Sequence, residues 1–169
     1  MKKIKLYLLI ASFQAVLLGF AGAASAGVNL MAEGGASFNT SNYGFITSPS
    51  PFVSGQLTFG MLDAVQWGFA YDHNFLSYSN NGGNGSLNFY GATVRVSTLV
   101  TGFFIDGQAG IDIRDSSDSS FSWGIGAGYT IPLNFFFDFG PRFSYRSVPD
   151  SGIERSLVDA GLFLTLKIL

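Results

Sequence analysis

Residues 120–146, SFSWGIGAGYTIPLNFFFDFGPRFSYR, carry side chains of two kinds that alternate along the chain. Every second residue from Phe121 to Ile131, and again from Phe135 to Tyr145, is aromatic, aliphatic or proline. The residues between them are mostly glycine, serine, threonine or charged. Because successive side chains of a β-strand point to opposite faces, this period of two predicts two strands joined by segment 132–134. An inward aromatic face would make the protein soluble, and an outward one would place it in lipid.

The same alternation recurs after residue 26 and predicts eight strands in all. Their expected bounds are 28–38, 52–61, 65–78, 87–97, 103–114, 121–131, 135–146 and 155–169. Connections 62–64, 98–101 and 132–134 are short, whereas 39–51, 79–86, 115–119 and 148–154 are longer and polar. We therefore expect tight turns at one end of the structure and longer loops at the other. Pro141 has no N–H to donate to a ladder, and we expect a bulge there.

The first 26 residues have the pattern of a secretory signal peptide. A basic start, MKKIK, precedes an apolar stretch, and Ala24-Ser25-Ala26 fits the A-x-A cleavage pattern. We expect cleavage after Ala26, so that residues 1–26 are the signal peptide and the mature chain, 27–169, begins at Gly27. The alternative is a retained membrane anchor, because residues 6–24 nearly reach the roughly 20 residues of a spanning helix.

Charge and cysteine content exclude several classes of protein. Without the signal peptide, six cations face eleven acids, a net charge of −5 that argues against nucleic-acid binding. The absence of cysteine excludes disulfides and lipoprotein-type lipidation. Lys167 is the one lysine after residue 26, too few for a soluble β protein that covers its outer face and edges with charge.

These observations favour the aromatic face pointing outward. A soluble barrel would expose glycine and isolated charges to water, whereas strands in lipid must close into a barrel that is apolar outside and polar inside. Each run reaches the roughly 9–11 residues of a tilted transmembrane strand. Aromatic residues also gather near the expected strand ends, as in interfacial girdles. The sequence therefore predicts an all-β fold: an eight-stranded antiparallel up-and-down transmembrane β-barrel after a cleaved signal peptide.

In strand number, alternation and turn pattern, residues 27–169 resemble the small eight-stranded outer-membrane barrels of the OmpA/OmpX type. The resemblance implies a bacterial outer membrane, both termini in the periplasm, contact with outer-membrane lipids and insertion by the barrel-assembly machinery. We expect a monomer. One departure concerns the last residue, since many such proteins end on an aromatic residue and this chain ends on Leu169.

The inner faces of the predicted strands carry charges of both signs. Because charges in a narrow interior should be paired, we expect a lumenal ion-pair network. Its predicted members are Glu33, Asp72, Arg95, Asp106, Asp138, Arg142, Arg146 and Asp159, with Asp112 and Lys167 beside them. The expected central cluster is Arg142, Asp159 and Glu33. Such a network predicts a plugged lumen, and the alternative is a small porin-like channel with a narrow or gated ion path.

No motif in the chain indicates catalysis, a cofactor or a metal. His73 is the one histidine, and the position two residues later is Phe75, where lipid A-modifying deacylases carry a serine. The glycines of GIGAGY (124–129) lie within a strand, not at the start of a helix. The two acids of RDSSDSS (114–120) are too few for a calcium cage. We therefore expect a non-enzymatic protein of envelope structure or surface interaction, with a lipid A-modifying enzyme as the second alternative.

Overall fold

The computed structural model describes residues 27–40, 49–60, 64–77, 84–98, 101–114, 118–150 and 153–168. The expected signal peptide, its cleavage site up to Ala26, and Leu169 lie outside these residues. These described residues form nine strands. They are β1 (Gly27–Asn39), β2 (Ser50–Gly60), β3 (Val65–Ser77), β4 (Asn84–Ser97), β5 (Phe103–Arg114), β6 (Asp118–Tyr129), β7 (Ile131–Pro132), β8 (Phe137–Asp150) and β9 (Ile153–Ile168).

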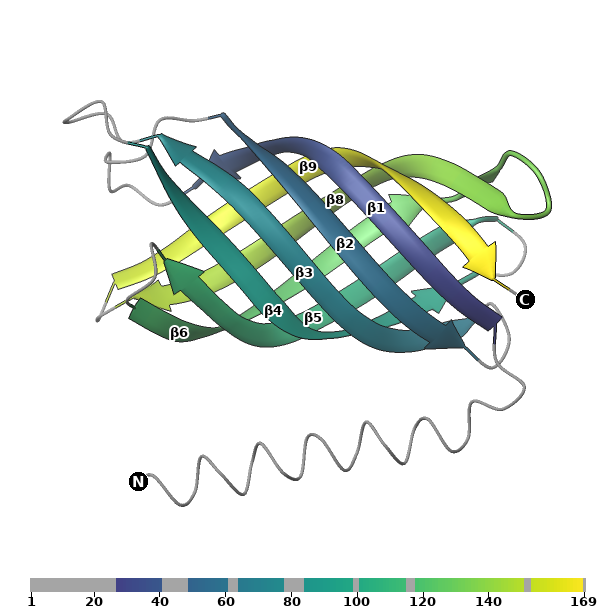
Figure 1. Ribbon diagram of the computed structural model, residues 1–169, viewed down its shortest axis with the longest axis horizontal. Helices are drawn as coiled ribbons and strands as arrows, with labels where there is room; N and C mark the ends of the chain where they lie inside the picture. The colour runs from purple at the N-terminus through teal and green to yellow at the C-terminus, as the bar shows by residue number, and fades with distance from the viewer. Residues whose placement is uncertain are drawn as a thin grey trace, which may run out of the picture.

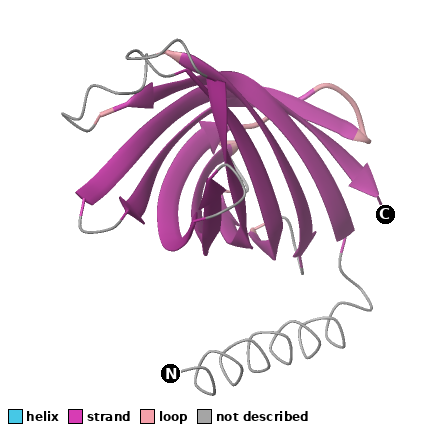
Figure 2. Cartoon of the chain, turned by 60° about the vertical axis from the view of Figure 1, so that its left-hand side comes forward, coloured by secondary structure: helices cyan, strands magenta, loops and turns pink. Residues whose placement is uncertain are grey.

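The strands form one closed antiparallel barrel (Figures 1 and 2). Neighbours along the chain pair from β1 to β6, β1 also pairs with β9, and β6 pairs with β8, which closes the sheet. The two-residue β7 continues the line of β6 along the same partner, β8. Because β6 and β7 lie in line, the barrel has eight strands around its circumference, which confirms the predicted strand number and fold class.

The pairing register fixes the tilt of the strands. Moving from each outward-facing residue to its partner on the next strand leads once around the barrel from Val28 to Phe38, ten residues farther along β1. The path runs through Val28, Phe59, Trp67, Val94, Gly107, Ile125, Tyr145, Val158 and Phe38. A stagger of this kind requires strands tilted by about 35–45° to the barrel axis. Residues that lie at the same height on opposite walls of the barrel therefore occupy different positions along their own strands.

The two faces of the barrel differ as the alternation predicts. The outer face exposes large apolar side chains on every long strand, including Leu30, Leu57, Phe69, Tyr90, Val94, Ile105, Ile111, Trp123, Ile125, Phe143, Leu162 and Leu164. The inward positions are buried and mostly polar. Because a barrel pairs the backbone groups of its strands internally, this apolar outer surface is compatible with hydrocarbon and unfavourable in water.

The prediction of a long loop is wrong for two of the four connections. β5 and β6 pair as far as Arg114↔Asp118, and β8 and β9 as far as Asp150↔Ile153, so these connections have three and two residues. The Gly-, Ser- and Asp-rich segments continue the strand pairing beyond the apolar belt, because backbone hydrogen bonds between strands do not require apolar side chains. The connections from β1 to β2 and from β3 to β4 remain the longer ones.

The expected bulge at Pro141 is also wrong. β8 keeps one register against β6 and β7, from Trp123↔Ser147 to Pro132↔Asp138, with no inserted residue. The ladder with β8 is instead interrupted at Tyr129 and Thr130, which stand opposite Pro141 and Gly140, while on the β5 side the N–H of Thr130 donates to the carbonyl of Gly102 at 2.8 Å. Gly102 has a φ of 74°, and a Cβ there would lie 2.5 Å from the Thr130 carbonyl oxygen. The missing proline N–H is thus accommodated by a gap between β6 and β7.

Candidate functional site: the charged lumen

The barrel brings the predicted charged residues into its lumen. Glu33, Asp72, Arg95, Asp106, Asp138, Arg142, Arg146 and Asp159 each expose 6% of their surface or less. They come from six of the long strands and occupy successive heights along the barrel. The lumen can therefore be described in layers, from the end with the short turns to the end with the loops.

Arg142 on β8 is the centre of the middle layer. Its Nε and Nη2 donate to the two carboxylate oxygens of Asp106 on β5 at 2.8 and 2.7 Å, and its Nη1 donates to Glu33 Oε2 on β1 at 2.9 Å. A two-pronged arginine–carboxylate pair of this kind is among the strongest side-chain interactions. The guanidinium thus joins strands from opposite walls across the lumen.

The expected central cluster is partly wrong, because Asp159 does not bond to Arg142. Arg142 directs its donors to Asp106 and Glu33. Asp159 instead lies beside Ser37 and Ser144, its cross-strand partners on β1 and β8. Arg142 reaches Asp106 on β5, which is two strands away by way of β6, whereas Asp159 is on β9, the neighbour on the other side of β8.

Arg95 on β4 lies beside the middle layer, toward the turn end. Its Nη2 donates to Gln56 Oε1 at 3.3 Å and lies 3.6 Å from Asp106 Oδ2 and 3.1 Å from the sulfur of Met31. Its guanidinium carbon stands 4.0 Å from the centre of the Phe104 ring, a cation–π contact.

Arg146 on β8 forms the next layer, toward the loops. Its Nη1 lies 2.9 Å from Asp72 Oδ2 and 3.7 Å from Asp112 Oδ1, and its Nη2 donates to Asn74 Oδ1. The guanidinium carbon is 5.3 Å from the centre of the Phe89 ring. Acids outnumber arginines in this half of the lumen.

Apolar lumenal residues were missed by the sequence reasoning, which assigned the inner face to small and polar side chains. Met31, Phe104 and Phe163 form a buried cluster beside Arg95. A second buried cluster lies at the loop end of the lumen and consists of Leu76, Leu87, Val148 and Leu157. The alternating pattern at the expected strand ends could have revealed this second cluster, because these residues keep the inward parity of their strands.

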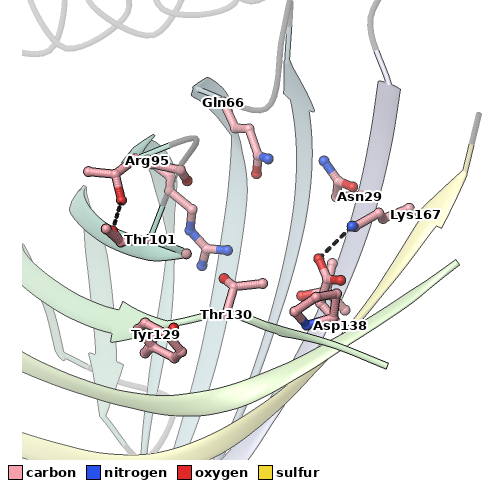
Figure 3. Close-up of a pocket in the computed structure, with 13 residues that line it drawn as sticks. Asn29, Gln66, Arg95, Thr101, Tyr129, Thr130, Asp138 and Lys167 are labelled. Carbon is pink, nitrogen blue, oxygen red and sulfur yellow. Dashed lines mark hydrogen bonds and ion pairs between the residues drawn. The ribbon is translucent and has the colours of Figure 1, made fainter. Parts of the chain in front are cut away.

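At the turn end the lumen holds a polar pocket of about 340 Å³ (Figure 3). Arg95 lies at its inner end, and Lys167 donates to Asp138 Oδ2 at 2.8 Å on its wall. Strand ends and turn segments complete the lining, with Asn29, Gln66, Ser97, Thr98, Thr101, Gly102, Tyr129, Thr130, Pro132 and Thr165.

His73 lies on the outer face of β3, as its parity predicts. Its Nδ1 is 2.7 Å from Asn88 Oδ1 on β4, which also accepts a hydrogen bond from the Tyr71 hydroxyl at 3.1 Å. Its ring packs edge-on against Phe75, the residue that stands where the deacylase pattern would place a serine. Among the described residues, no group of His, Cys, Asp and Glu side chains is arranged to hold a metal ion.

Gly126 makes room for the middle layer, and we expect Gly126→Ala to lower the free energy of unfolding by about 1–3 kcal/mol. A Cβ there would lie 2.6 Å from Asp106 Oδ1 and 2.8 Å from Arg142 Nη2, two groups that hold each other in place. Urea unfolding in lipid vesicles, followed by tryptophan fluorescence, measures the change.

Gly107→Ala is the matched control for Gly126→Ala. Gly107 lies on β5 opposite Ile125, faces outward, and a Cβ there has no described atom within 4 Å. We expect its effect to stay within about 0.5 kcal/mol. Equal losses for the two variants would show that the cost comes from strand glycines in general and not from the ion-pair layer.

A closed antiparallel barrel with eight strands around its circumference, apolar outside and polar within, is the fold of the small outer-membrane barrels of the OmpA/OmpX type. In the part of the chain that the structure describes, no helix has the length and apolar character needed to cross a membrane.

Comparisons with known proteins agree with this fold class. No protein-family model and no curated protein matches the chain. Among solved structures, it is similar to Neisserial surface protein A, with a TM-score of 0.63 and 11% identity over 83% of this chain and 97% of that one. It is also similar to Ail, the attachment invasion locus protein of Yersinia pestis, with a TM-score of 0.58 and 10% identity over 83% of this chain and 99% of that one. At such identities the likeness concerns the fold.

Proposed function

We propose that this chain is a non-enzymatic protein of the bacterial outer membrane, with a lumen closed to solutes, that serves envelope structure or contact at the cell surface. The observation that carries the proposal is the set of arginine–carboxylate contacts across the lumen, centred on Arg142, together with the aliphatic cluster at the loop end. Side chains can fill the interior of an eight-stranded barrel, and contacts across the lumen at several heights support that reading here.

The apolar outer face supports the membrane location, because it leaves large side chains such as Phe143 and Leu162 each 61% exposed. A surface role is in keeping with the names of the two similar structures, a surface protein and an attachment invasion locus protein. The proposal includes a monomer in contact with outer-membrane lipids, inserted by the barrel-assembly machinery, with both termini in the periplasm. Gly27 and Ile168 lie at the same end of the barrel, as that topology requires (Figure 1).

Conductance tests the closed lumen. We expect purified wild-type protein in planar bilayers to show no steady channel, because Arg142 and Arg146 bond to acids on other strands across the lumen and an aliphatic cluster lies at its loop end. Steady large conductance from pure protein would contradict this and favour a small porin-like channel. A lipid A mass spectrum with and without the protein distinguishes the remaining alternative, a lipid-modifying enzyme, for which we expect no change.

A further inference from the structure

The turn-end pocket lies at the end of the barrel where the described chain begins and ends. Its lining comes from residues near the turn-side ends of the strands, such as Asn29, Ser97 and Lys167. Arg95 lies at its inner end, and the Met31, Phe104 and Phe163 cluster packs beside that arginine. At about 340 Å³, it is at the small end of the range of ligand pockets, about 300–1,000 Å³.

Arg95 and Gln66 supply hydrogen-bond donors at this cavity. Arg95 is 6% exposed, and its Nε has no hydrogen-bond partner among the described residues. The Gln66 Oε1 accepts from the Thr58 hydroxyl at 3.2 Å, which leaves the Gln66 amide nitrogen to donate into the lumen. In Figure 3 the Arg95 guanidinium points into the space that Gln66, Thr130 and Lys167 surround.

Two cations and one acid line the pocket, and Arg95 also has Asp106 as an ion-pair partner, 3.6 Å away. Arg95 and Lys167 face a single acid on the wall, Asp138, which already accepts from Lys167 at 2.8 Å. Asp106, behind Arg95, uses both oxygens for Arg142. The acids in excess, around Arg146, belong to the other half of the lumen. A buried cation with a free donor favours a partner that is a hydrogen-bond acceptor and carries negative charge.

We propose that this pocket binds a small oxyanion, a carboxylate or a phosphate, with Arg95 as its principal contact and Lys167 and Gln66 as further donors. The proposal goes beyond the structural role above, because it assigns a ligand to a pocket at one end of the lumen, and it does not require a solute to pass through the barrel.

Titration of the full chain in a nonionic detergent tests the proposal, since a phosphocholine detergent would itself supply phosphate. The probes are inorganic phosphate and acetate, with chloride at the same ionic strength as the control. We expect the ¹⁵N–¹H resonance of Arg95 Nε to shift in a saturable way with at least one oxyanion and not with chloride. Saturation by phosphate alone or by acetate alone identifies the class. No saturable shift with either, or an equal shift with chloride, would overturn the proposal.

Two variants assign the contacts. We expect Lys167→Met to weaken binding severalfold, and Arg95→Met to weaken it by about tenfold or more, because a charge-assisted bond is lost. Lys167 is 30% exposed in its side chain, so its variant should fold even if the Arg95 variant does not. Arg114, at the loop end of β5, is outside the pocket, and Arg114→Met should bind as wild type does. Unchanged affinity in Lys167→Met together with an unshifted Arg95 resonance would place any binding elsewhere and refute the site.

Discussion

Arg142→Met should lower the free energy of unfolding by about 3–5 kcal/mol, the cost of breaking a buried ion pair by removing one partner. The substitution keeps a long side chain but removes three donors, two bound to Asp106 and one to Glu33. Among the described residues, Glu33 then has no arginine within bonding distance, and Asp106 keeps Arg95, at 3.6 Å. Both acids are almost fully buried, at 5% and 1% exposure, so water cannot replace the guanidinium without opening the lumen.

Urea unfolding in lipid vesicles measures this loss, and Lys167→Met is its matched control. Lys167 makes one ion pair, with Asp138, at the more accessible turn end. Lys167 is 30% exposed in its side chain and Asp138 lines the turn-end pocket, so water can solvate this acid when the lysine is removed, and we expect a smaller loss than for Arg142→Met. Replacing Glu33 and Asp106 by Gln and Asn in the Arg142→Met background should restore part of the loss, since neutral amides are less costly to bury than unpaired carboxylates. Equal, small effects of the two single variants would contradict a stabilising role for the middle layer.

Ile125→Arg should cost about 2–4 kcal/mol, the penalty of an arginine on the lipid face near the bilayer midplane. Ile125 is 53% exposed on the outer face of β6, opposite Gly107 and Tyr145. It lies next to Gly126 and so at the height of the Arg142 layer. The new guanidinium would have to lose its hydration or pull water and headgroups into the hydrocarbon.

The same unfolding measurement compares Ile125→Arg with Asn84→Arg. Asn84 is an exposed residue at the loop end of β4, where we expect a change within about 0.5 kcal/mol. If both positions tolerate arginine equally in vesicles, the apolar face does not lie in hydrocarbon, and the membrane assignment is wrong.

Much of the fold follows from the alternation along the chain. The alternation with a period of two indicates which side chains share a face of the strand. The scarcity of lysine and the abundance of outward aromatic residues indicate which face meets lipid. Strand bounds were close for β3 and β5, where apolar residues continue to the ends. They were too short at the loop ends of β6, β8 and β9, because polar residues there look like loops although their backbones still pair.

Contacts across the lumen could not be predicted in the same way. Alternation placed Arg142, Glu33, Asp106 and Asp159 on the inner face, but it carries no information on which of them meet. That depends on the ten-residue stagger around the barrel, which sets the heights of residues on opposite walls. The stagger directs Arg142 to Asp106 and Glu33 and leaves Arg95 facing the turn-end pocket. The local sequence pattern therefore determines which side chains of a strand face the lumen, whereas the closure of the whole barrel determines which of these side chains meet inside it.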